Sequence, residues 1–473
     1  MTESRTEALE RLAGREFDVL VIGGGIVGAG IAEAATAHGL SVALVDKGDF
    51  AGATSSASSK LVHGGLRYLA MGDVRLVREA HAERRMLMQT VAPHLVQRLR
   101  FVFPFYPGGP YSPWFVQSGI LLYSALARSR LHRPLTAARA RALVPPLHTG
   151  GLRTAAIYAD AWTNDGRLTI ANLRAAAEAG AVVLNYAEAT AVTAGQATVS
   201  ADGAEVRVRA RRVVNATGPW VDRVRLLEDD SAAPSIRLSK GVHVVVEGGE
   251  GWGAAVTIPQ EAGRVSFAIP WEGTLLLGTT DTLHEDGPDH VEATPADVAE
   301  VLREASTAIG GLGPVRTTFA GLRALPLGSG STTSARREVV FSTGPTGLVS
   351  VAGGKLTTYR KIALDALAHA GVTGLDRRPR PLPGATGLDS VAWPAGLDAP
   401  TRAHLLRLYG SLASEVLEPA REDPSLLERI VPDRPDIRAQ ELYARTHEWA
   451  VTDEDVLRRR TTAWLGAAPV LVS

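Results

Sequence analysis

The 473-residue chain is too long for one ordinary hydrophobic core, so we expect two or three domains. Its 50 lysines and arginines balance 50 aspartates and glutamates, and no net positive field favours nucleic acid as a partner. The absence of cysteine excludes disulfides, thiolate metal sites, cysteine-ligated iron–sulfur clusters and cysteine nucleophiles. Redox chemistry would therefore need a bound organic cofactor, and we expect no metal site.

The N-terminal region predicts a cytoplasmic protein. Its first sixteen residues alternate charged and small polar side chains without an apolar core, which argues against a secretory signal. No segment of the chain reaches about 18 uninterrupted apolar residues, so a membrane-spanning helix is not expected.

A dinucleotide-binding fingerprint follows. Residues 17–22 predict a strand, Gly23-Gly24-Gly25-Ile26-Val27-Gly28 a tight turn, and residues 29–38 a helix. The first glycine allows the turn, the third lets the backbone approach a pyrophosphate, and the last lets the helix pack on the strand. The free N–H groups at the helix N-terminus would face the phosphates.

A second strand, 42–45, ends at Asp46, about 20 residues into the unit, where an acidic side chain accepts hydrogen bonds from a ribose hydroxyl. The run Thr54–Tyr68 then brings small hydroxyls, a glycine pair, an imidazole and a guanidinium directly behind this fingerprint. We expect cofactor and substrate chemistry to meet there.

Two helical segments come next. Residues 73–97 predict a helix with a basic face, for which a solvated surface is favoured over membrane contact. Residues 100–113 are rich in Phe, Pro, Tyr and Gly, and the apolar stretch Trp114–Leu126 precedes a basic exit of three arginines. That stretch fits an interfacial membrane helix or a buried helix at a domain junction, and the pattern leaves both open.

The middle of the chain returns to alternating elements. Residues 168–178 predict a helix, 181–185 a strand, and 187–210 a small antiparallel sheet with a turn at 201–203. The strand 212–215 ends at Asn215-Ala216-Thr217-Gly218-Pro219-Trp220, where small residues would let the backbone approach a ligand. By itself this pattern is a strand-to-turn junction.

The second half predicts a substrate platform. Its short β-rich runs suggest an antiparallel sheet, followed by a helix and one further strand. Two later strands and the turn Gly353–Thr358 opening a helix return the chain to the nucleotide fold. These runs are 236–246, 255–258, 265–270 and 274–278, the helix 295–309, the strand 319–325, the late strands 339–342 and 348–351, and the last helix to about 369.

We therefore expect an α/β protein with a discontinuous Rossmann-like cofactor-binding domain, an antiparallel-sheet substrate domain and a small C-terminal helical domain. The predicted parts are 17–72, 151–225 and 335–375 for the cofactor domain, 73–150 for a helical and apolar segment of the substrate domain with a candidate membrane-facing surface, 235–330 for the substrate sheet, and 390–473 for the C-terminal domain.

Five separated motifs resemble the FAD-dependent, aerobic glycerol-3-phosphate dehydrogenases, within the two-domain flavoproteins that include glycine and D-amino-acid oxidases. The glycine turn and Asn215-Ala216-Thr217-Gly218 mark the wider class. The five motifs are Thr54–Tyr68, Lys240-Gly241-Val242-His243, Gly278-Thr279-Thr280-Asp281, Gly321-Leu322-Arg323 and Gly353-Gly354-Lys355-Leu356-Thr357-Thr358-Tyr359-Arg360.

The resemblance implies that FAD oxidises sn-glycerol 3-phosphate to dihydroxyacetone phosphate, with electrons passed to a membrane quinone. It further implies a protein held peripherally on the inner face of the cell membrane, and a homo-oligomer stays open. A hydride leaves C2 only if the hydroxyl proton leaves too, so the site needs a base and a cation near the developing alkoxide.

The implied reaction assigns roles to particular residues. His63 and His243 are candidates for the base, and the choice between them stays open; Arg323 is expected at the C2 oxygen. Lys355 at the start of the late helix is expected, with Gly354 and Leu356, under the N1 and O2 end of the flavin, where positive charge stabilises the anionic reduced form.

The phosphate dianion prefers the forked donors of arginine, which predicts contacts with Arg67, Arg323 and Arg336, accompanied by Tyr68. The expected cofactor contacts are Gly23, Gly24, Gly25, Ile26, Gly28, Asp46, Lys47, Thr54, Ser55, Ser56, Ser59, Lys60, His63, Gly64, Ala189, Ala216, Thr217, Gly218, Trp220, Gly354, Lys355, Leu356 and Thr357.

Two departures from the family pattern accompany the resemblance. Asp46 is one methylene shorter than the usual glutamate, which would favour a water-mediated ribose contact, and the chain ends soon after Leu457–Thr461 where family members usually continue.

Three other functions compete with the quinone-linked dehydrogenase. The main one is a glycerol-3-phosphate oxidase that passes electrons to oxygen and releases peroxide. The absence of cysteine disfavours the anaerobic multi-subunit dehydrogenase. The presence of His63, Arg67, Arg323 and Lys355 disfavours a non-catalytic flavin-binding or membrane scaffold.

Overall fold

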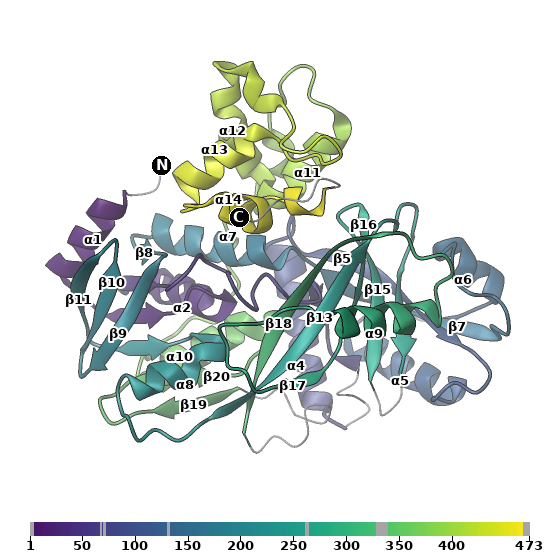
Figure 1. Ribbon diagram of the computed structural model, residues 1–473, viewed down its shortest axis with the longest axis horizontal. Helices are drawn as coiled ribbons and strands as arrows, with labels where there is room; N and C mark the ends of the chain where they lie inside the picture. The colour runs from purple at the N-terminus through teal and green to yellow at the C-terminus, as the bar shows by residue number, and fades with distance from the viewer. Residues whose placement is uncertain are drawn as a thin grey trace.

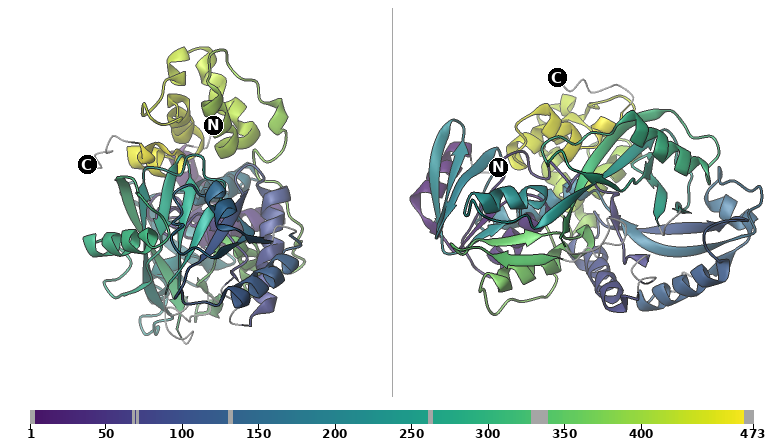
Figure 2. Two further views of the ribbon diagram at one scale, coloured as in Figure 1. Left: turned by 90° about the vertical axis from the view of Figure 1, so that its right-hand side faces the viewer. Right: turned by 60° about the horizontal axis from the view of Figure 1, so that its bottom comes forward.

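The computed structural model describes residues 4–66, 69, 72–129, 133–260, 264–327 and 339–466. Figure 1 shows a layered α/β body on one side, a large twisted sheet on the other, and the C-terminal helices above them. In the side view of Figure 2 the C-terminal helices stand clear of the sheets over most of their height. The architecture confirms the expected fold class.

The nucleotide-binding body is a six-stranded sheet with helices packed on it. Its strands follow the order β19-β20-β12-β2-β3-β8 and are parallel except for β19. Buried Val, Leu and Ile side chains on both faces explain why its central strands read as continuous apolar runs. The strands are β2 (Val19–Ile22), β3 (Val42–Val45), β8 (Val182–Leu184), β12 (Val213–Asn215), β19 (Val340–Thr343) and β20 (Val349–Ala352), and the packed helices are α2 (Ile26–Ala37), α7 (Asp165–Glu178) and α10 (Tyr359–His369).

A smaller sheet lies beside this body, with strand order β1-β11-β10-β9. The predicted antiparallel meander is confirmed, and β1 adds to it in parallel. Helix α1 covers it and starts with a capping box in which Ser4 and Glu7 satisfy each other's backbone N–H groups. The elements are α1 (Arg5–Gly14), β1 (Glu16–Phe17), β9 (Ala187–Thr193), β10 (Gln196–Ala201) and β11 (Ala204–Ala210); α8 (Val221–Leu226) follows β12.

The substrate-side sheet has ten strands. Eight follow the order β17-β13-β16-β15-β14-β5-β7-β4, and the other two lie off this path, with β18 paired to β13 and β6 paired to β7. Every pairing is antiparallel except β14 with β5, so the sheet is mixed. The strands are β4 (Leu61–Val62), β5 (Gln97–Phe105), β6 (Arg133–Leu135), β7 (Thr154–Trp162), β13 (Ile236–Val246), β14 (Ala255–Pro259), β15 (Val265–Trp271), β16 (Thr274–Gly278), β17 (Thr282–His284) and β18 (Val315–Pro326).

Two parts of this sheet differ from the sequence expectations. β5 lies in the segment 73–150 that was expected to be helical and apolar, and β7 lies in the segment 151–225 assigned to the cofactor domain. The two strands pair along their whole length from Gln97–Trp162 to Phe105–Thr154. Most residues of both strands are buried, and buried strands show no alternating pattern to reveal them.

The helices on the substrate side also have sharper limits than expected. The helix predicted over 73–97 is α4 (Val74–Met86), extended by one π-helical stretch (Leu87–Val91) that ends where Ala92 leaves helical geometry. The others are α5 (Pro113–Leu126), α6 (Ala137–Leu143) and α9 (Pro295–Ser306). Among the described residues, no helix combines the length and apolar character needed to cross a bilayer.

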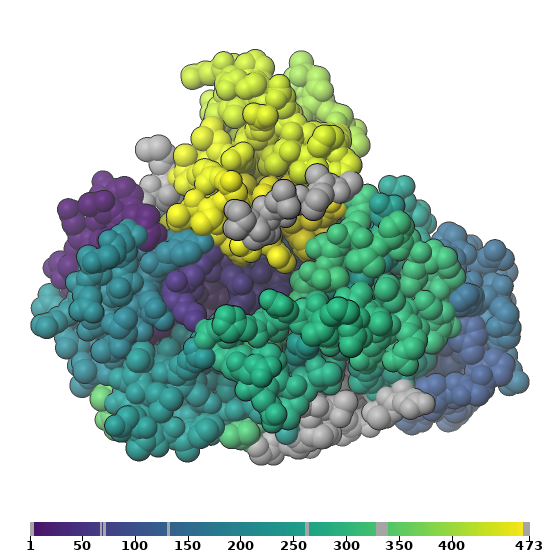
Figure 3. Space-filling view, viewed as in Figure 1, coloured from purple at the N-terminus to yellow at the C-terminus, as the bar shows by residue number. Residues whose placement is uncertain are grey.

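The C-terminal domain is a set of short helices around its own core of buried Leu, Val and Tyr side chains, as the proline breaks predicted. Its helices are α11 (Ala399–Tyr409), α12 (Ala413–Leu417), α13 (Arg438–His447), α14 (Asp453–Asp455) and the π-helical turn Val456–Arg460. In the space-filling view of Figure 3 its yellow residues overhang a hollow in which purple N-terminal residues are visible.

Candidate active site

A cavity of about 1700 Å³ lies where the nucleotide-binding body and the substrate sheet meet. Its wall combines segments far apart in sequence: the glycine turn, residues 46–59, the loop after β4, α5, the end of β12, strands β13 and β18, and the turn before α10. Most of the side chains and turns that the sequence motifs singled out therefore face one continuous cavity.

The glycine turn has the shape that a pyrophosphate site requires. Gly23 has φ +108°, and a Cβ there would lie 2.7 Å from the Ala216 carbonyl oxygen. A Cβ on Gly28 would lie 1.8 Å from the Gly23 oxygen, so helix α2 can approach the strand this closely only with glycine. This cradle, which any side chain would fill, fits a dinucleotide.

Ser55 ties the next loop to the start of α2. Its Oγ accepts a hydrogen bond of 2.9 Å from the Ile26 N–H, and a Cβ on Gly25 would lie 3.0 Å from the same oxygen. The loop therefore lies over the helix N-terminus.

Asp46 closes the ribose side of the turn. Its Oδ2 accepts a hydrogen bond from the Gly24 N–H at 2.6 Å, and its Oδ1 accepts one from the Gly48 N–H at 2.9 Å. Burial raises the pKa of this carboxyl to about 6, against the two N–H bonds, which favour the charged form. Each oxygen keeps acceptor capacity on the cavity wall, which suits a ribose hydroxyl.

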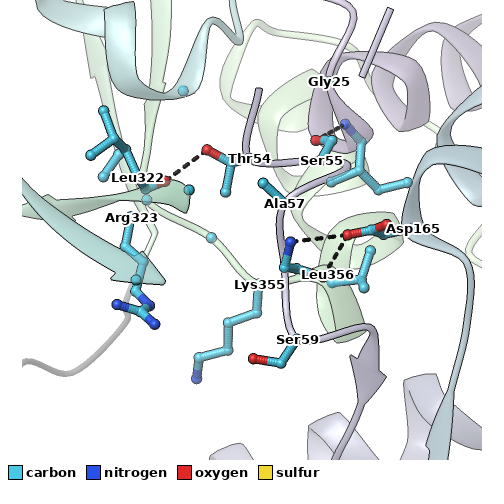
Figure 4. A pocket seen from close by; sticks show the side chains of 18 of the residues that line it. Gly25, Thr54, Ser55, Ala57, Ser59, Asp165, Leu322, Arg323, Lys355 and Leu356 are labelled. Carbon is cyan, nitrogen blue, oxygen red and sulfur yellow. Dashed lines mark hydrogen bonds between the residues drawn. The ribbon is translucent and has the colours of Figure 1, made fainter. Parts of the chain in front are cut away.

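The loop 54–60 is fastened on the substrate side and on the helix side. Thr54 donates to the Leu322 carbonyl oxygen at 2.7 Å, and Ser59 Oγ lies 2.8 Å from His243 Nε2. On the other side, Lys60 Nζ donates to Asp165 Oδ1 at 2.6 Å. Figure 4 shows the Thr54–Leu322 bond and the position of Asp165 at the pocket wall. The loop thus joins the two halves of the molecule across the cavity.

The position of Lys60 differs from the sequence expectation, which placed this residue among the cofactor contacts. Its side chain is 2% exposed, its ammonium also donates to the Ser56 carbonyl oxygen, and it lies over the rings of Trp271 and Phe319 at 5.3 and 5.2 Å. Burial lowers its pKa, while the Asp165 carboxylate opposes the shift. The ammonium therefore holds the loop from behind and does not reach the cofactor cavity.

Several other expected cofactor contacts also lie behind the wall. Gly64 packs on the ring of His81, where a Cβ would come within 2.2 Å of Cε1, and its neighbour Gly65 reaches the cavity in its place. Gly24, Gly28 and Ser56 shape the turns without lining the cavity, whereas the remaining expected cofactor residues lie on its wall.

His63 and His243 reach the cavity from two different segments, the loop after β4 and the strand β13. The His63 N–H donates to Thr357 Oγ1 at 3.0 Å, which joins the loop after β4 to the turn before α10. His243 is 3% exposed and stacks on Phe319 with ring centroids 4.9 Å apart. Burial, followed by the positive charges of Arg323 and Lys60, lowers its pKa well below the ordinary value, so this imidazole is neutral.

Arg323 occupies the junction of three of the family motifs. Its guanidinium donates to Thr279 Oγ1 at 2.9 Å and to the Thr280 carbonyl oxygen at 3.2 Å. A Cβ on Gly241 would lie 2.3 Å from Nη2, so the glycine of the neighbouring strand makes room for this cation. β18 pairs with β13 here, with Gly321 opposite Gly241, which explains why the motifs at 240–243, 278–281 and 321–323 meet.

Lys355 stands before the short 3₁₀ turn Leu356–Thr358, in extended conformation, next to Gly354 with φ +127°. In Figure 4 the Lys355 and Arg323 side chains leave neighbouring segments and extend toward the same part of the pocket. The phosphate candidates Arg67, Tyr68 and Arg336 lie outside the described residues. The cavity thus brings together four of the side chains expected to act on substrate or flavin.

Some wall residues were missed by the sequence reasoning. Asp165 supports the loop from the first turn of α7, Phe115 and Leu122 line the cavity from α5, and Arg459 lines it from the C-terminal domain. No local motif marks any of them; the apolar character of Trp114–Leu126 was the only signal.

Comparisons with known proteins agree with this architecture. The family described as "FAD dependent oxidoreductase" matches residues 18–360, and the family described as "C-terminal domain of alpha-glycerophosphate oxidase" matches residues 376–469. The glycerol-3-phosphate dehydrogenase of Mycobacterium leprae is 38% identical over 97% of this chain and 83% of its own length. The aerobic glycerol-3-phosphate dehydrogenase of Staphylococcus epidermidis is 37% identical over 77% of this chain and 68% of its own length.

Solved structures give the same answer. The glycerol-3-phosphate dehydrogenase of Bacillus halodurans, complexed with FAD, superposes with a TM-score of 0.77 at 29% identity, covering 98% of this chain and 89% of that one. The L-alpha-glycerophosphate oxidase of Mycoplasma pneumoniae, with FAD bound, shares the fold with a TM-score of 0.61 at 17% identity, covering 78% of this chain and 99% of that one. This chain therefore belongs to the FAD-dependent glycerol-3-phosphate dehydrogenases, and FAD is its cofactor.

Proposed function

We propose that the protein removes a hydride from C2 of sn-glycerol 3-phosphate, releases dihydroxyacetone phosphate and passes the electrons to a membrane quinone. The observation that carries this proposal is the continuity of one cavity. It extends from the glycine turn past His243, Arg323 and Lys355 to the inner side of α5. Cofactor, alcohol and an apolar electron acceptor can therefore share a single continuous cavity.

The chain's own groups would divide the work around the alcohol. Bound FAD supplies the hydride acceptor. His243 and His63 are the two candidates for accepting the hydroxyl proton, and both line the cavity. The Arg323 guanidinium, held by Thr279 and Thr280, is positioned to stabilise the negative charge that develops on the C2 oxygen.

Lys355 would hold the end of the flavin ring that gains negative charge on reduction. A fixed ammonium favours the reduced anionic form and so raises the cofactor's potential. The substrate phosphate would be bound by Arg67 and Arg336 with Tyr68 and Arg323 nearby, as the family motif implies.

The electron acceptor is proposed from α5. Only one side of this helix is buried, through Ile120, Tyr123 and Ser124, which supports an exposed role for the other side. On its open side, Trp114 is 81% and Leu121 57% exposed. An exposed apolar helix of this size fits a bilayer interface better than water.

Phe115 and Leu122 carry the link between that surface and the site. They are 58% and 47% exposed and also line the cavity, so an apolar quinone ring could pass along α5 from the lipid. Exposed arginines at positions 128, 133, 139 and 141 follow the helix and suit anionic headgroups. We accordingly propose a peripheral location on the inner face of the cell membrane.

The substrate assignment is tested by anaerobic titration of the purified yellow protein. sn-Glycerol 3-phosphate should bleach the flavin band, whereas its mirror image, lactate and glycine should not. Absence of bleaching with every glycerol phosphate isomer would overturn the proposal.

The acceptor is tested by turnover in air with and without a quinone analogue. We expect fast quinone reduction and little peroxide. Stoichiometric peroxide with no acceleration by quinone would assign the protein to the oxidase alternative.

A further inference from the structure

The C-terminal helical domain reaches the cofactor cavity, although its sequence carries no site motif. Glu454 and Arg459 line the cavity beside residues 46–52, the turn that follows the ribose-side strand β3. We propose that the C-terminal domain is a latch on this turn, hereafter the ribose turn, and that it retains FAD by fixing the turn in its binding geometry. Only the family's cofactor enters this inference, and the substrate and the electron acceptor do not.

The first contact of the latch is ionic and buried. The Asp49 carboxylate of the ribose turn has 1% of its side chain exposed, and it accepts hydrogen bonds from Arg460 Nη1 at 2.8 Å and Nη2 at 2.7 Å. Arg459 Nε and Asn185 Nδ2 complete the set. A buried carboxylate is tolerated only when it is paired and fully hydrogen-bonded, so the position of Asp49 depends on these two arginines.

The second contact is aromatic. Trp449 of the C-terminal domain packs edge-on against Phe50, with ring centroids 5.6 Å apart. Phe50 in turn lies on the glycine turn, since a Cβ on Gly24 would come within 2.4 Å of its ring, and the Ala51 N–H donates to the Gly24 oxygen at 3.1 Å. The C-terminal domain therefore presses the ribose turn onto the pyrophosphate turn.

A third contact reaches the groups that face the ribose. Gly48 donates to Asp46 Oδ1 at 2.9 Å, and its carbonyl oxygen accepts a hydrogen bond of 3.0 Å from the Tyr186 N–H. The Tyr186 hydroxyl donates to Asp455 Oδ1 at 2.7 Å, and Asp455 also accepts from Arg459 Nη2 at 2.6 Å. Asp46 and Gly48 both line the cavity.

Through these contacts the C-terminal domain can affect how tightly FAD is held. The ribose turn is bounded by the cavity on one side and by C-terminal residues on the other, as the yellow residues above the purple ones in Figure 3 show. Loosening the domain would free Asp46 and the glycine turn to move, and a cofactor site that must be ordered during binding holds its ligand less tightly. FAD release should therefore become faster when the latch is cut.

The test removes one contact of the latch by substitution and compares the effect with removal of a buried contact of the same domain elsewhere. Arg459→Met removes a cation whose side chain is 8% exposed from the ribose turn. Arg434→Met is the control: this side chain is 5% exposed and docks the same domain on the substrate sheet, through the Glu272 carbonyl oxygen at 2.7 Å. Arg459→Lys serves as the conservative variant that keeps the charge.

The readouts are the rate of FAD release, followed by free-flavin fluorescence after dilution, and the Tm of holoprotein and apoprotein. We expect Arg459→Met to release FAD at least tenfold faster, Arg459→Lys to fall between it and wild type, and Arg434→Met to stay within twofold. Since FAD stabilises only the form that binds it, the gap between holo and apo Tm should narrow for Arg459→Met alone.

Equal release rates for Arg459→Met and Arg434→Met at equal loss of Tm would overturn the proposal. If Arg459→Met does not fold, Trp449→Leu decides, because it removes the ring behind Phe50 and leaves every ion pair in place. Wild-type release from folded Trp449→Leu protein would then be the contradicting result.

Discussion

The two ends of the cavity are built in different ways. At the nucleotide end, the turn 23–28 and Asp46 come from one continuous strand–helix–strand unit, and the Gly24 N–H donates to the Asp46 carboxylate. At the reaction end, His63, His243, Arg323 and Lys355 come from four segments spread over almost 300 residues. The groups of the first end lie close together in sequence, whereas those of the second meet only after the whole chain has folded.

Because the two ends are built differently, substitutions at each end should affect different properties of the enzyme. Changes at the nucleotide end should remove the cofactor, since steric fit of the backbone is decisive there. Changes at the reaction end should leave FAD bound and lower the rate, since single side chains supply the charge.

Gly28→Ala should cause the largest loss. The added Cβ would lie 1.8 Å from the Gly23 oxygen, so the turn and the start of α2 must separate. We expect colourless protein without FAD and destabilisation on the order of 4 kcal/mol, measured by flavin absorbance and thermal unfolding. Gly14→Ala is the control, since nothing lies within 4 Å of a Cβ there, and a yellow, stable Gly28→Ala protein would contradict the account.

Arg323→Met should keep FAD and lose turnover. Removing one donor from a developing oxyanion typically costs about 10²–10³ in kcat, and Arg323→Lys should restore part of it. The measurement is steady-state kinetics together with the flavin spectrum. Arg316→Met, on the same strand but ion-paired to Asp433, should keep its kcat, and a less than twofold effect of Arg323→Met would remove Arg323 from the proposed chemistry.

The double change Trp114→Ser and Leu121→Ser should weaken membrane binding by about tenfold, because it removes two large apolar groups from the interface. Vesicles containing anionic lipid and co-sedimentation provide the measurement, with a soluble quinone analogue to show that the site itself is intact. Leu226→Ser with Leu283→Ser, which are 47% and 55% exposed elsewhere on the surface, should have no effect. Equal losses for both pairs would exclude α5 as the docking face.

Acid should destabilise the fold through the buried imidazole of His81. Burial, aided by Arg84, lowers the pKa of His81 to about 3, so below pH 6.5 the unfolded chain binds a proton that the folded chain does not. Stability therefore falls as pH falls, by about 2 kcal/mol for this group between pH 7 and pH 5. Thermal unfolding of His81→Gln should show a correspondingly shallower pH dependence, and an unchanged slope would contradict the assignment.

The sequence predicted the nucleotide end well because its information is local. Glycines at fixed offsets and an acidic residue after the second strand are recognisable without knowing the rest of the fold. The reaction end was reached only through the resemblance, since neither spacing nor periodicity places Arg323 beside Thr279. Strands β5 and β7 were missed because β7 and the second half of β5 are continuously buried and show no alternation.

The sequence also could not predict which way a given side chain points. The sequence placed Lys60 in the cofactor loop, but whether its ammonium faced the cavity depended on Asp165, which arrives from helix α7. The same holds for Asp49, whose buried carboxylate is satisfied by arginines more than 400 residues away. Such long-range charge pairing leaves no mark in local sequence.

FAD held by the nucleotide end of the cavity should take a hydride from C2 of the substrate held at the reaction end. Rapid anaerobic mixing of the yellow protein with glycerol 3-phosphate deuterated at C2 tests it most directly, with C1-deuterated substrate as the control. The account predicts that deuterium at C2 slows bleaching of the flavin band and that deuterium at C1 does not. Equal rates for all three substrates in a step shown to be flavin reduction, or no bleaching at all, would contradict it.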